Sequence, residues 1–414
     1  MADRVGVVGR VVVVGGSVGG LRAAEAVRKT GYAGEVLVVG AERHMPYNRP
    51  PLSKEALATG PDVAGLTFRV PRAARDVQFR LGEPVVSADL EARTVTLAGG
   101  EVLGWEGLVV ATGLAARRLA LPGPRGGRHV LRTVEDALEL RASMPAGSKV
   151  VVIGAGFVGC EVAATARGLG CEVDVVAPES APMERPLGHD LGTALRRRHE
   201  AAGVRFHLGN VPTQLVGEDR VTSVLLTDGS RLDADVVLEA VGSSPNVEWL
   251  HGSGLDLRDG LLCDSQMRVE GRADVVACGD VARFPNLLFD AVPRRVEHWT
   301  MAIDTAKKAG HTLDAYLVGA ALDVEPFRPV PSFWSDQYDL RIQSFGAVWL
   351  GGDDIRVLEG RLGSGVAVGY HRHGVLVGVV LVGMTGSYLA YRDLIAQAAA
   401  TAPAVAGGSV GSSR

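Results

Sequence analysis

The chain has 414 residues, more than one hydrophobic core usually organises, so we expect two or three domains. Hydrophobic residues make up 47% of it, but no apolar run reaches the roughly 18 residues that a membrane helix needs. The formal net charge of -4 argues against a nucleic-acid-binding surface. Because the start of the chain also lacks a signal-peptide pattern, we expect a cytoplasmic protein.

The first predicted unit is a strand, a helix and a second strand over residues 10–40, with a glycine-rich turn from Gly15 to Gly20. A GxGxxG turn brings the backbone close to a pyrophosphate and presents free N–H groups at a helix N-terminus. Ser17 replaces the second glycine and is small enough for the same approach. Glu42, after the second strand, is the predicted partner of an adenosine ribose.

The same pattern returns over residues 149–177, where Gly154, Gly156 and Gly159 form a complete GxGxxG turn. The two units are therefore predicted to be distant repeats. Two turns of this kind predict two dinucleotides, a bound flavin at the first and a visiting nicotinamide at the second. An oxidoreductase is the leading interpretation.

Three further buried strands are predicted to end in small residues, which let the chain pass close to a nucleotide. The small residues at these ends are Ala111, Thr112, Gly113, Gly242 and Gly279. Asp280 follows directly, and its carboxylate can accept hydrogen bonds from sugar hydroxyls. After Ala282 the pattern changes to a helix over about 297–310, then to short alternating strands and a helix near Leu389.

The four cysteines, Cys160, Cys171, Cys263 and Cys278, contain no closely spaced pair. A flavoenzyme that reduces disulfides needs such a pair beside the flavin, so that class is excluded. Metal ligation fails the same test of spacing, and no metal site is predicted. We expect all four side chains to serve in packing.

Four more motifs follow in a fixed order: PYNRPPLSKE at 46–55, DVVACGDVA at 274–282, RVEHW at 295–299 and FWSDQYDLRIQ at 333–343. Together with the glycine turns they resemble the flavin-dependent ferredoxin reductases of bacterial oxygenase systems. This is the family of putidaredoxin, rubredoxin and biphenyl-dioxygenase ferredoxin reductases.

The resemblance implies an α/β fold with two Rossmann-like dinucleotide-binding domains, arranged as in glutathione reductase, plus a C-terminal α+β domain. Residues 1–112 and 247–324 would form a discontinuous FAD-binding domain, and 113–246 the NAD(P)H-binding domain. The C-terminal domain would span 325–401. Residues 402–414 are small and polar and are expected to be a disordered tail.

The resemblance also assigns two catalytic residues. Lys54 would point at the reactive edge of the flavin, where a cation stabilises the negative charge of the reduced ring. Glu161 would lie at the nicotinamide pocket, although a glutamate in a first helical turn is also favoured by the helix dipole. Ser53 and Glu55 are expected to begin a helix.

Further residues are assigned to the cofactors. Arg49 would reach the pyrophosphate or adenine side of the flavin nucleotide, and Asp280 its ribityl chain. Other cofactor-binding candidates are Arg117, Glu297, His298, Trp299 and Trp334. His298 is given no acid–base role, because hydride transfer to a flavin needs no strong base.

The choice of nicotinamide depends on the end of the strand at 172–177. Ala177 stands where an acidic residue would mark NADH, and no lysine or arginine follows before Arg185. Because Glu179 can reach the ribose, NADH is favoured over NADPH.

The expected reaction is hydride transfer from NADH to FAD, followed by release of single electrons to a small acidic iron–sulfur ferredoxin. Docking would be weak and steered by charge, with the enzyme a monomer or weak dimer. Candidate docking cations are Arg69, Arg72, Arg75, Arg294 and Arg295.

Two alternatives stay open. One is a reductase of the same fold that acts on rubredoxin, a quinone or monodehydroascorbate. The other is a redox-responsive binding protein of the apoptosis-inducing-factor type.

Overall fold

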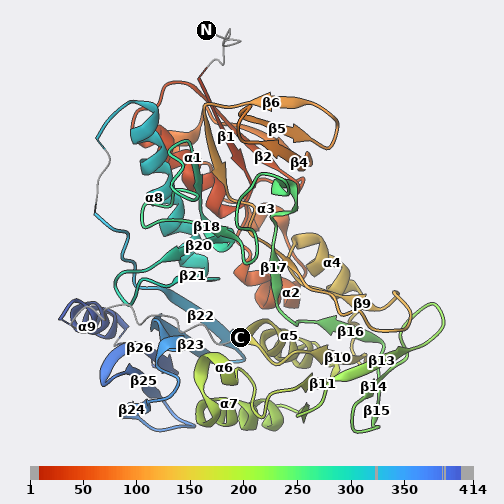
Figure 1. The fold of residues 1–414 in the computed structure, drawn as a ribbon. Helices are drawn as coiled ribbons and strands as arrows, with labels where there is room; N and C mark the ends of the chain where they lie inside the picture. The colour runs from red at the N-terminus through yellow and green to blue at the C-terminus, as the bar shows by residue number, and fades with distance from the viewer. Residues whose placement is uncertain (1–8, 322–324, 385, 387, 402–414) are drawn as a thin grey trace, which may run out of the picture.

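The computed structural model describes residues 9–321, 325–384, 386 and 388–401. Within them lie two five-stranded parallel sheets and one five-stranded antiparallel sheet, with smaller antiparallel sheets beside them. The C-terminal sheet lies beside the second parallel sheet, at the opposite end of the molecule from the first (Figure 1). The expected tail at 402–414 lies outside the described residues.

The first parallel sheet has the strand order β19-β7-β1-β2-β3. Its strands are β1 (Arg10–Val14), β2 (Glu35–Gly40), β3 (Gln78–Leu81), β7 (Gly107–Val110) and β19 (Val275–Ala277). The valine-rich central strands are buried on both faces, as a covered parallel sheet requires. Helices α1 (Val18–Lys29) and α8 (Trp299–Leu317) pack against each other on one face (Figure 1).

The predicted helix at 297–310 is wrong at both ends, because α8 begins at Trp299 and runs on to Leu317. Glu297 and His298 therefore precede the helix. Gly310 lies inside it and serves close packing, since a Cβ there would come within 2.5 Å of the Ala26 Cβ on α1.

The second parallel sheet repeats the first, with the order β12-β11-β10-β16-β9. Its strands are β9 (Arg128–His129), β10 (Lys149–Ile153), β11 (Glu172–Ala177), β12 (Val204–Leu208) and β16 (Val236–Glu239). Its helices are α4 (Val134–Ala142), α5 (Phe157–Gly168), α6 (Glu184–Leu187) and α7 (His189–Ala201). Strands β10, β11, β12 and β16 correspond to β1, β2, β3 and β7, so the predicted internal repeat is confirmed.

Short antiparallel sheets and single turns connect these units. The sheets are β4 (Val85–Asp89), β5 (Thr94–Leu97) and β6 (Val102–Gly104); β13 (Pro212–Val216), β14 (Ser223–Leu226) and β15 (Arg231–Asp233); β18 (Leu261–Leu262), β20 (Ala282–Pro285) and β21 (Pro293–Arg295); and the pair β8 (Leu114–Ala116) with β17 (Ser243–Pro245). The short helices are η1 (Pro50–Ser53), α2 (Glu55–Thr59), α3 (Val63–Leu66), η2 (Arg72–Ala74), η3 (Glu248–Leu250), η4 (Gly279–Val281) and η5 (Val348–Leu350).

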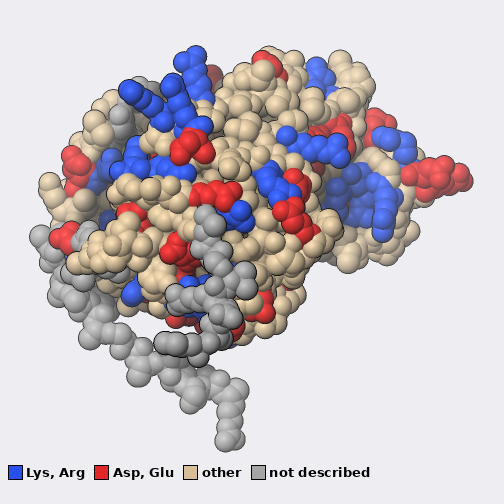
Figure 2. All heavy atoms as spheres, turned by 90° about the horizontal axis from the view of Figure 1, so that it is seen from above, with Lys and Arg blue, Asp and Glu red and all other residues tan. Residues whose placement is uncertain are grey.

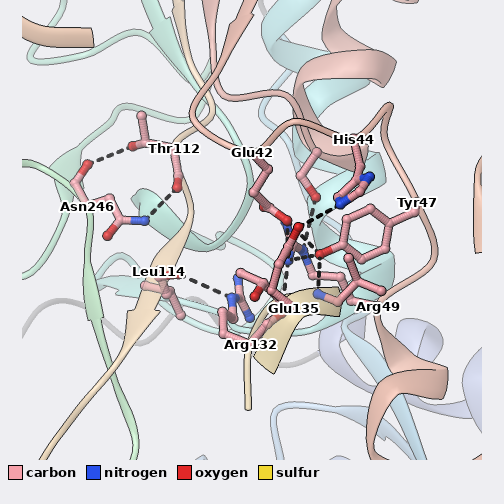
Figure 3. A network of polar contacts seen from close by, with 12 residues as sticks. Glu42, His44, Tyr47, Arg49, Thr112, Leu114, Arg132, Glu135 and Asn246 are labelled. Atoms are coloured by element: carbon pink, nitrogen blue, oxygen red, sulfur yellow. Dashed lines mark hydrogen bonds and ion pairs between the residues drawn. The ribbon is translucent and has the colours of Figure 1, made fainter. Parts of the chain in front are cut away.

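Two crossings of the chain between the parallel sheets lie side by side. Thr112 Oγ1 donates to the Asn246 carbonyl at 2.7 Å, and Asn246 Nδ2 donates to the Thr112 carbonyl at 2.9 Å (Figure 3). Strand β8, which follows Thr112, pairs with β17, which directly precedes Asn246. This double crossing supports the domain boundaries that we propose at 112/113 and 246/247.

The C-terminal unit is an antiparallel sheet of order β22-β23-β26-β25-β24, followed by α9 (Tyr388–Thr401). Its strands are β22 (Ser332–Gln337), β23 (Leu340–Gly346), β24 (Ile355–Gly360), β25 (Val366–Arg372) and β26 (Val375–Val382). Alternating side chains face α9 on one side and α6 and α7 on the other. The predicted α+β pattern is confirmed.

All four cysteines are free and buried, as expected for packing residues. Burial raises the pKa of the Cys278 thiol to about 12. None of the described helices is both long and apolar enough to cross a membrane.

Candidate functional site

One cavity of about 1360 Å³ lies where the carboxyl ends of the two parallel sheets meet the C-terminal unit. It exceeds the roughly 300–1,000 Å³ of an ordinary small-molecule pocket, so it offers room for more than one ligand. The carboxyl ends of parallel strands are also where open α/β sheets bind nucleotides.

Most of the predicted site residues line this cavity. They are Gly15, Ser17, Glu42, Arg49, Lys54, Ala111, Thr112, Gly113, Gly156, Glu161, Gly242, Gly279, Asp280, Glu297, His298, Trp299 and Trp334. The predicted residues that do not line it are Gly20, Arg117, Gly154, Gly159 and Glu179.

The first glycine turn brings β1, β7 and α1 into close contact. Gly15 has a φ of +125°, and a Cβ there would lie 2.1 Å from the Ala111 carbonyl oxygen. A Cβ on Gly20 would lie 1.9 Å from the Gly15 oxygen, so Gly20 serves helix packing. Ser17 is the N-cap of α1 but makes no side-chain capping bond, which leaves the first N–H groups of the helix to an anion.

The second turn has the same construction. A Cβ on Gly154 would lie 2.3 Å from the Ala240 oxygen, and one on Gly159 would lie 2.1 Å from the Gly154 oxygen. At Gly156, the N-cap of α5, a Cβ would meet nothing within 4 Å. The turn therefore leaves open space beside the helix N-terminus.

Glu42 and Arg49 form an ion pair beside the first turn (Figure 3). Tyr47 Oη donates to Glu42 at 2.6 Å, and Arg49 Nη1 donates to the Arg132 carbonyl at 2.9 Å. Arg49 Nε also donates to Ser17 Oγ at 3.3 Å. Arg49 thus fixes the Glu42 carboxylate in place and keeps a positive charge near the turn.

Lys54 and Glu161 form a buried ion pair across the cavity wall, with Nζ to Oε2 at 2.8 Å and side-chain exposures of 11% and 6%. Lys54 also donates to the Pro50 carbonyl at 2.9 Å. The expectation that Ser53 begins a helix is wrong: Ser53 closes η1, and its hydroxyl donates to Glu161. The side chains of Lys54, Ser53 and Glu161 therefore form one hydrogen-bonded cluster.

Asp280 accepts a hydrogen bond from Arg132 Nη2 at 3.1 Å, and burial raises the pKa of its carboxyl group. Arg132, just before α4, lines the cavity but was not predicted, since nothing in its sequence neighbourhood distinguishes it. Glu297 accepts from Arg295 at 2.7 Å and from Ser243 at 3.0 Å.

His298 lies in an aromatic wall. Its ring centroid is 4.9 Å from that of Phe333 and 6.0 Å from that of Trp349, and burial lowers its pKa to about 4. Its Nδ1 has no hydrogen-bond partner among the described residues. His298 is therefore neutral near pH 7, which agrees with the absence of a predicted acid–base role.

The aromatic wall was only partly predicted. Trp299 lines the cavity and stacks on Phe68 with centroids 6.3 Å apart, while Arg341 lies over Trp334. The aromatic lining residues that were not predicted are Phe157, Trp249, Phe333 and Trp349. Phe157 lies within the second glycine turn and Phe333 within the FWSDQYDLRIQ motif, so their positions could have marked them, whereas no motif contains Trp249 or Trp349.

Ala177 was considered in the sequence analysis as the position that would contact the ribose of the nicotinamide nucleotide. In the structure it is only 1% exposed and packs in the core of the second sheet. Glu179 pairs with Arg185, Oε1 to Nε at 3.2 Å, and the Arg185 side chain is 84% exposed. An acidic and a basic group thus lie together beyond β11. Arg117 Nε donates to Ser244 Oγ at 2.9 Å, outside the cavity lining.

The candidate docking arginines fall into two groups. Arg294 is paired with Asp290, and Arg295 with Asp259 and Glu297, so their charges are already compensated. Arg69, Arg72 and Arg75 are exposed and have no ion-pair partner within the described part of the chain. Arg69 follows Phe68, the stacking partner of the cavity residue Trp299.

Family models match most of the chain. The model described as pyridine nucleotide-disulphide oxidoreductase matches residues 9–306, and the model described as reductase C-terminal matches residues 332–409.

Two curated relatives show the extent of the similarity. Rhodocoxin reductase of Rhodococcus erythropolis is 34% identical, over 93% of this chain and 89% of its own length. The ferredoxin–NAD(+) reductase component of the anthranilate 1,2-dioxygenase system of Burkholderia cepacia is 34% identical, over 95% of both chains.

Solved structures agree in fold. A ferredoxin reductase from Rhodopseudomonas palustris superposes with a TM-score of 0.85 at 34% identity, over 92% of each chain. The reductase in a covalent putidaredoxin reductase–putidaredoxin complex gives 0.86 at 30% identity, over 94% of this chain and 93% of that one.

Proposed function

Because this chain belongs to the pyridine nucleotide-disulphide oxidoreductase family, among its ferredoxin reductases, we propose that it moves electrons from NADH to a ferredoxin that serves an oxygenase. The observation that carries the proposal is the single cavity that joins both glycine turns to the Lys54–Glu161 pair. The free, buried cysteines argue against disulfide chemistry despite the family description. We also propose a cytoplasmic location.

The residues fit FAD in the first part of the cavity. The uncapped N-terminus of α1 suits a pyrophosphate, and the unpartnered His298 Nδ1 is a polar atom that a ligand would satisfy. Ser17, Glu42, Arg49 and Asp280 would hold the nucleotide and its ribityl chain. When bound, FAD would supply hydride acceptance and one-electron release.

The protein side chains would prepare this chemistry by holding charge in place. The Lys54 ammonium is kept at the cavity wall by Glu161 and by the Pro50 carbonyl. In a buried site, a fixed cation stabilises developing negative charge without having to reorganise. The aromatic wall of His298, Phe333 and Trp349 would limit the access of water.

We favour NADH over NADPH as the donor. Glu179 is available to accept from ribose hydroxyls beyond β11, whereas a carboxylate there repels a 2′-phosphate. The adjacent Arg185 weakens this repulsion, so the preference should be modest. The ribose would be read by Glu179 and not at Ala177, whose side chain is buried.

The experiment is an anaerobic titration of the purified protein with NADH and, in parallel, NADPH, followed by the visible absorbance of the flavin. Rapid bleaching that is faster with NADH supports the proposal. A Glu179→Gln variant should bring the two rates closer together. Protein without flavin colour, or colour that neither donor bleaches, would reject a reductase.

A further inference from the structure

Buried polar side chains lead away from Glu161 into β22 and on to α7. Ser335 Oγ lies 2.6 Å from Glu161 Oε1, and Gln337 Nε2 lies 3.1 Å from Ser335 Oγ. His199 Nε2 lies 2.8 Å from Gln337 Oε1, and the Tyr338 hydroxyl lies 3.2 Å from His199 Nδ1. These four residues form a hydrogen-bonded chain that ends at the carboxylate.

The donor and the acceptor of each hydrogen bond in this series can be assigned by starting from the Glu161 carboxylate. An ionised carboxylate only accepts, so Ser335 must give its one proton to Glu161 and accept from the Gln337 amide N–H. The Gln337 oxygen then faces His199, which must carry its proton on Nε2. His199 Nδ1 accepts from Tyr338. All donors therefore point toward Glu161.

Three of the four hydrogen-bonded residues are withdrawn from water, which makes their hydrogen bonds important for stability. Ser335 is 0% exposed, and Gln337 and His199 are each 1% exposed. A buried polar group costs free energy unless it is hydrogen-bonded, and aligned bonds in a low dielectric strengthen one another. The neighbouring hydrophobic cluster includes Leu187, Leu191, Leu195 and Met183, and the Met183 sulfur also accepts from Gln337 Nε2 at 3.4 Å.

We propose that Ser335, Gln337 and His199 are positioning residues that hold the Glu161 carboxylate in alignment with Lys54. The inference rests on the proposed function for the meaning of that pair. Ser335 and Gln337 come from the C-terminal sheet and His199 from α7, so docking of the C-terminal unit on the second nucleotide-binding unit completes the site.

The proposal predicts what the Ser335 hydroxyl does for the ion pair. The Glu161 carboxylate faces the Lys54 ammonium, from the loop before α2, and its Oε1 accepts from the Ser335 hydroxyl of β22. A hydrogen bond to a charged group is stronger than one between neutral groups. Removing the Ser335 hydroxyl takes away the donor to Oε1, so the carboxylate is held less firmly against Lys54.

The first test compares the rate of flavin reduction at saturating NADH. Ser335→Ala should lower this rate about tenfold, as the loss of a hydrogen bond to a charged group does, and Ser335→Thr should restore it. Ser344→Ala is the matched control, because Ser344 is a buried serine of β23 whose hydroxyl has no partner among the described residues. Equal rates for Ser335→Ala and Ser344→Ala would overturn the proposal.

The second test needs no enzymatic activity, and the variant in it serves only to assign a signal of the wild-type protein. Nitrogen-15 NMR of histidine-labelled wild-type protein, with the signal assigned by His199→Gln, reports which ring nitrogen is protonated. We expect the proton on Nε2; a proton on Nδ1 alone would reverse the chain and overturn the inference. If NADH fails to reduce the flavin, the proposed function fails, while this spectrum still decides the orientation of the chain.

Discussion

The Lys54–Glu161 pair joins residues 107 positions apart, and both side chains are almost fully withdrawn from water. Removing water from two charges costs several kcal/mol per ion, and attraction repays it only when the remaining polar positions are also satisfied. Here Ser53, Ser335 and the Pro50 carbonyl supply those bonds. Removing only one member of the pair should therefore lower the stability of the protein, because it leaves the other charge buried without a partner.

Lys54→Met should slow flavin reduction by NADH about 10²-fold, because the fixed cation at the cavity wall is lost. It should also lower the free energy of unfolding by about 3 kcal/mol, because Glu161 stays buried without its partner. Stopped-flow absorbance and urea unfolding measure the two effects.

The double variant Lys54→Met/Glu161→Gln is the control for that second effect. It should recover much of the lost stability without recovering the rate. A wild-type rate in Lys54→Met would remove this residue from the catalytic machinery.

Asp280→Ala should lose flavin during purification, because the proposed contact to the ribityl chain disappears and Arg132 is left unpaired. The ratio of flavin absorbance to protein after desalting measures this loss. Asp256→Ala is a matched control, since Asp256 also pairs with arginines but lies outside the cavity. Full flavin occupancy in Asp280→Ala would exclude Asp280 from the site.

His298 makes folding stability depend on pH. Its pKa is about 4 in the folded chain against 6.5 in the unfolded one, so the unfolded state binds more protons between these values. The contribution of neutral His298 to the free energy of unfolding is thus fully present above pH 6.5 and is lost as the pH falls toward 4. Between pH 7 and 5 the loss from this residue should be about 2 kcal/mol.

His298→Gln should remove that part of the pH dependence, as measured by urea unfolding at a series of pH values. An unchanged slope in the variant would mean that His298 is solvated in the folded protein.

At the scale of elements, the contact between α1 and α8 depends on a glycine. A Cβ at Gly310 would lie 2.5 Å from the Ala26 Cβ and 2.9 Å from the Ala23 carbonyl oxygen. Because α8 also packs behind β7 and β19, separating the two helices would disturb the sheet that carries the first glycine turn.

Gly310→Ala should therefore destabilise the protein by about 1–3 kcal/mol, as overpacking does. Gly168 is also helical but exposed, and a Cβ there would meet nothing within 4 Å, so Gly168→Ala should stabilise by about 0.5–1 kcal/mol. Thermal unfolding compares the two. Equal changes in stability for the two variants would show that α1 and α8 can move apart enough to accommodate the added methyl group.

At the scale of the whole molecule, charge is dispersed. On the face shown in Figure 2, the described basic side chains lie in separate groups with acidic side chains between them. A protein partner would therefore meet local patches. Arg69, Arg72 and Arg75 are the uncompensated candidates, and Arg69 directly follows Phe68, which stacks on Trp299.

Replacing Arg69, Arg72 and Arg75 by serine should lower the rate of reduction of an acidic [2Fe–2S] ferredoxin about tenfold at low salt, and less at high salt, since steering is screened. Flavin reduction by NADH should not change. Arg294→Ser is the control, because its charge is already paired. A loss that is independent of salt would argue against steering by these residues.

The sequence by itself determined what depends on local pattern. Glycine spacing and valine runs predicted both βαβ units and the internal repeat, because tight turns and buried strands require particular residue types at particular spacings. The glycine turns and the family motifs together predicted site residues of which most line the cavity, although these residues are a minority of its lining. Helix ends were less accurate: Gly310 resembles a helix terminator until the neighbouring α1 is known.

Only the tertiary structure decided which side chains act together. Lys54, Glu161 and Ser335 come from three segments, Arg132 meets Asp280 across 148 positions, and Glu179 meets Arg185 beyond β11. These contacts depend on how the separate sheets pack against one another, and the spacing of residues along the sequence does not reveal which of them come close in space. For the same reason, burial turned Ala177 from a candidate ribose position into a core residue.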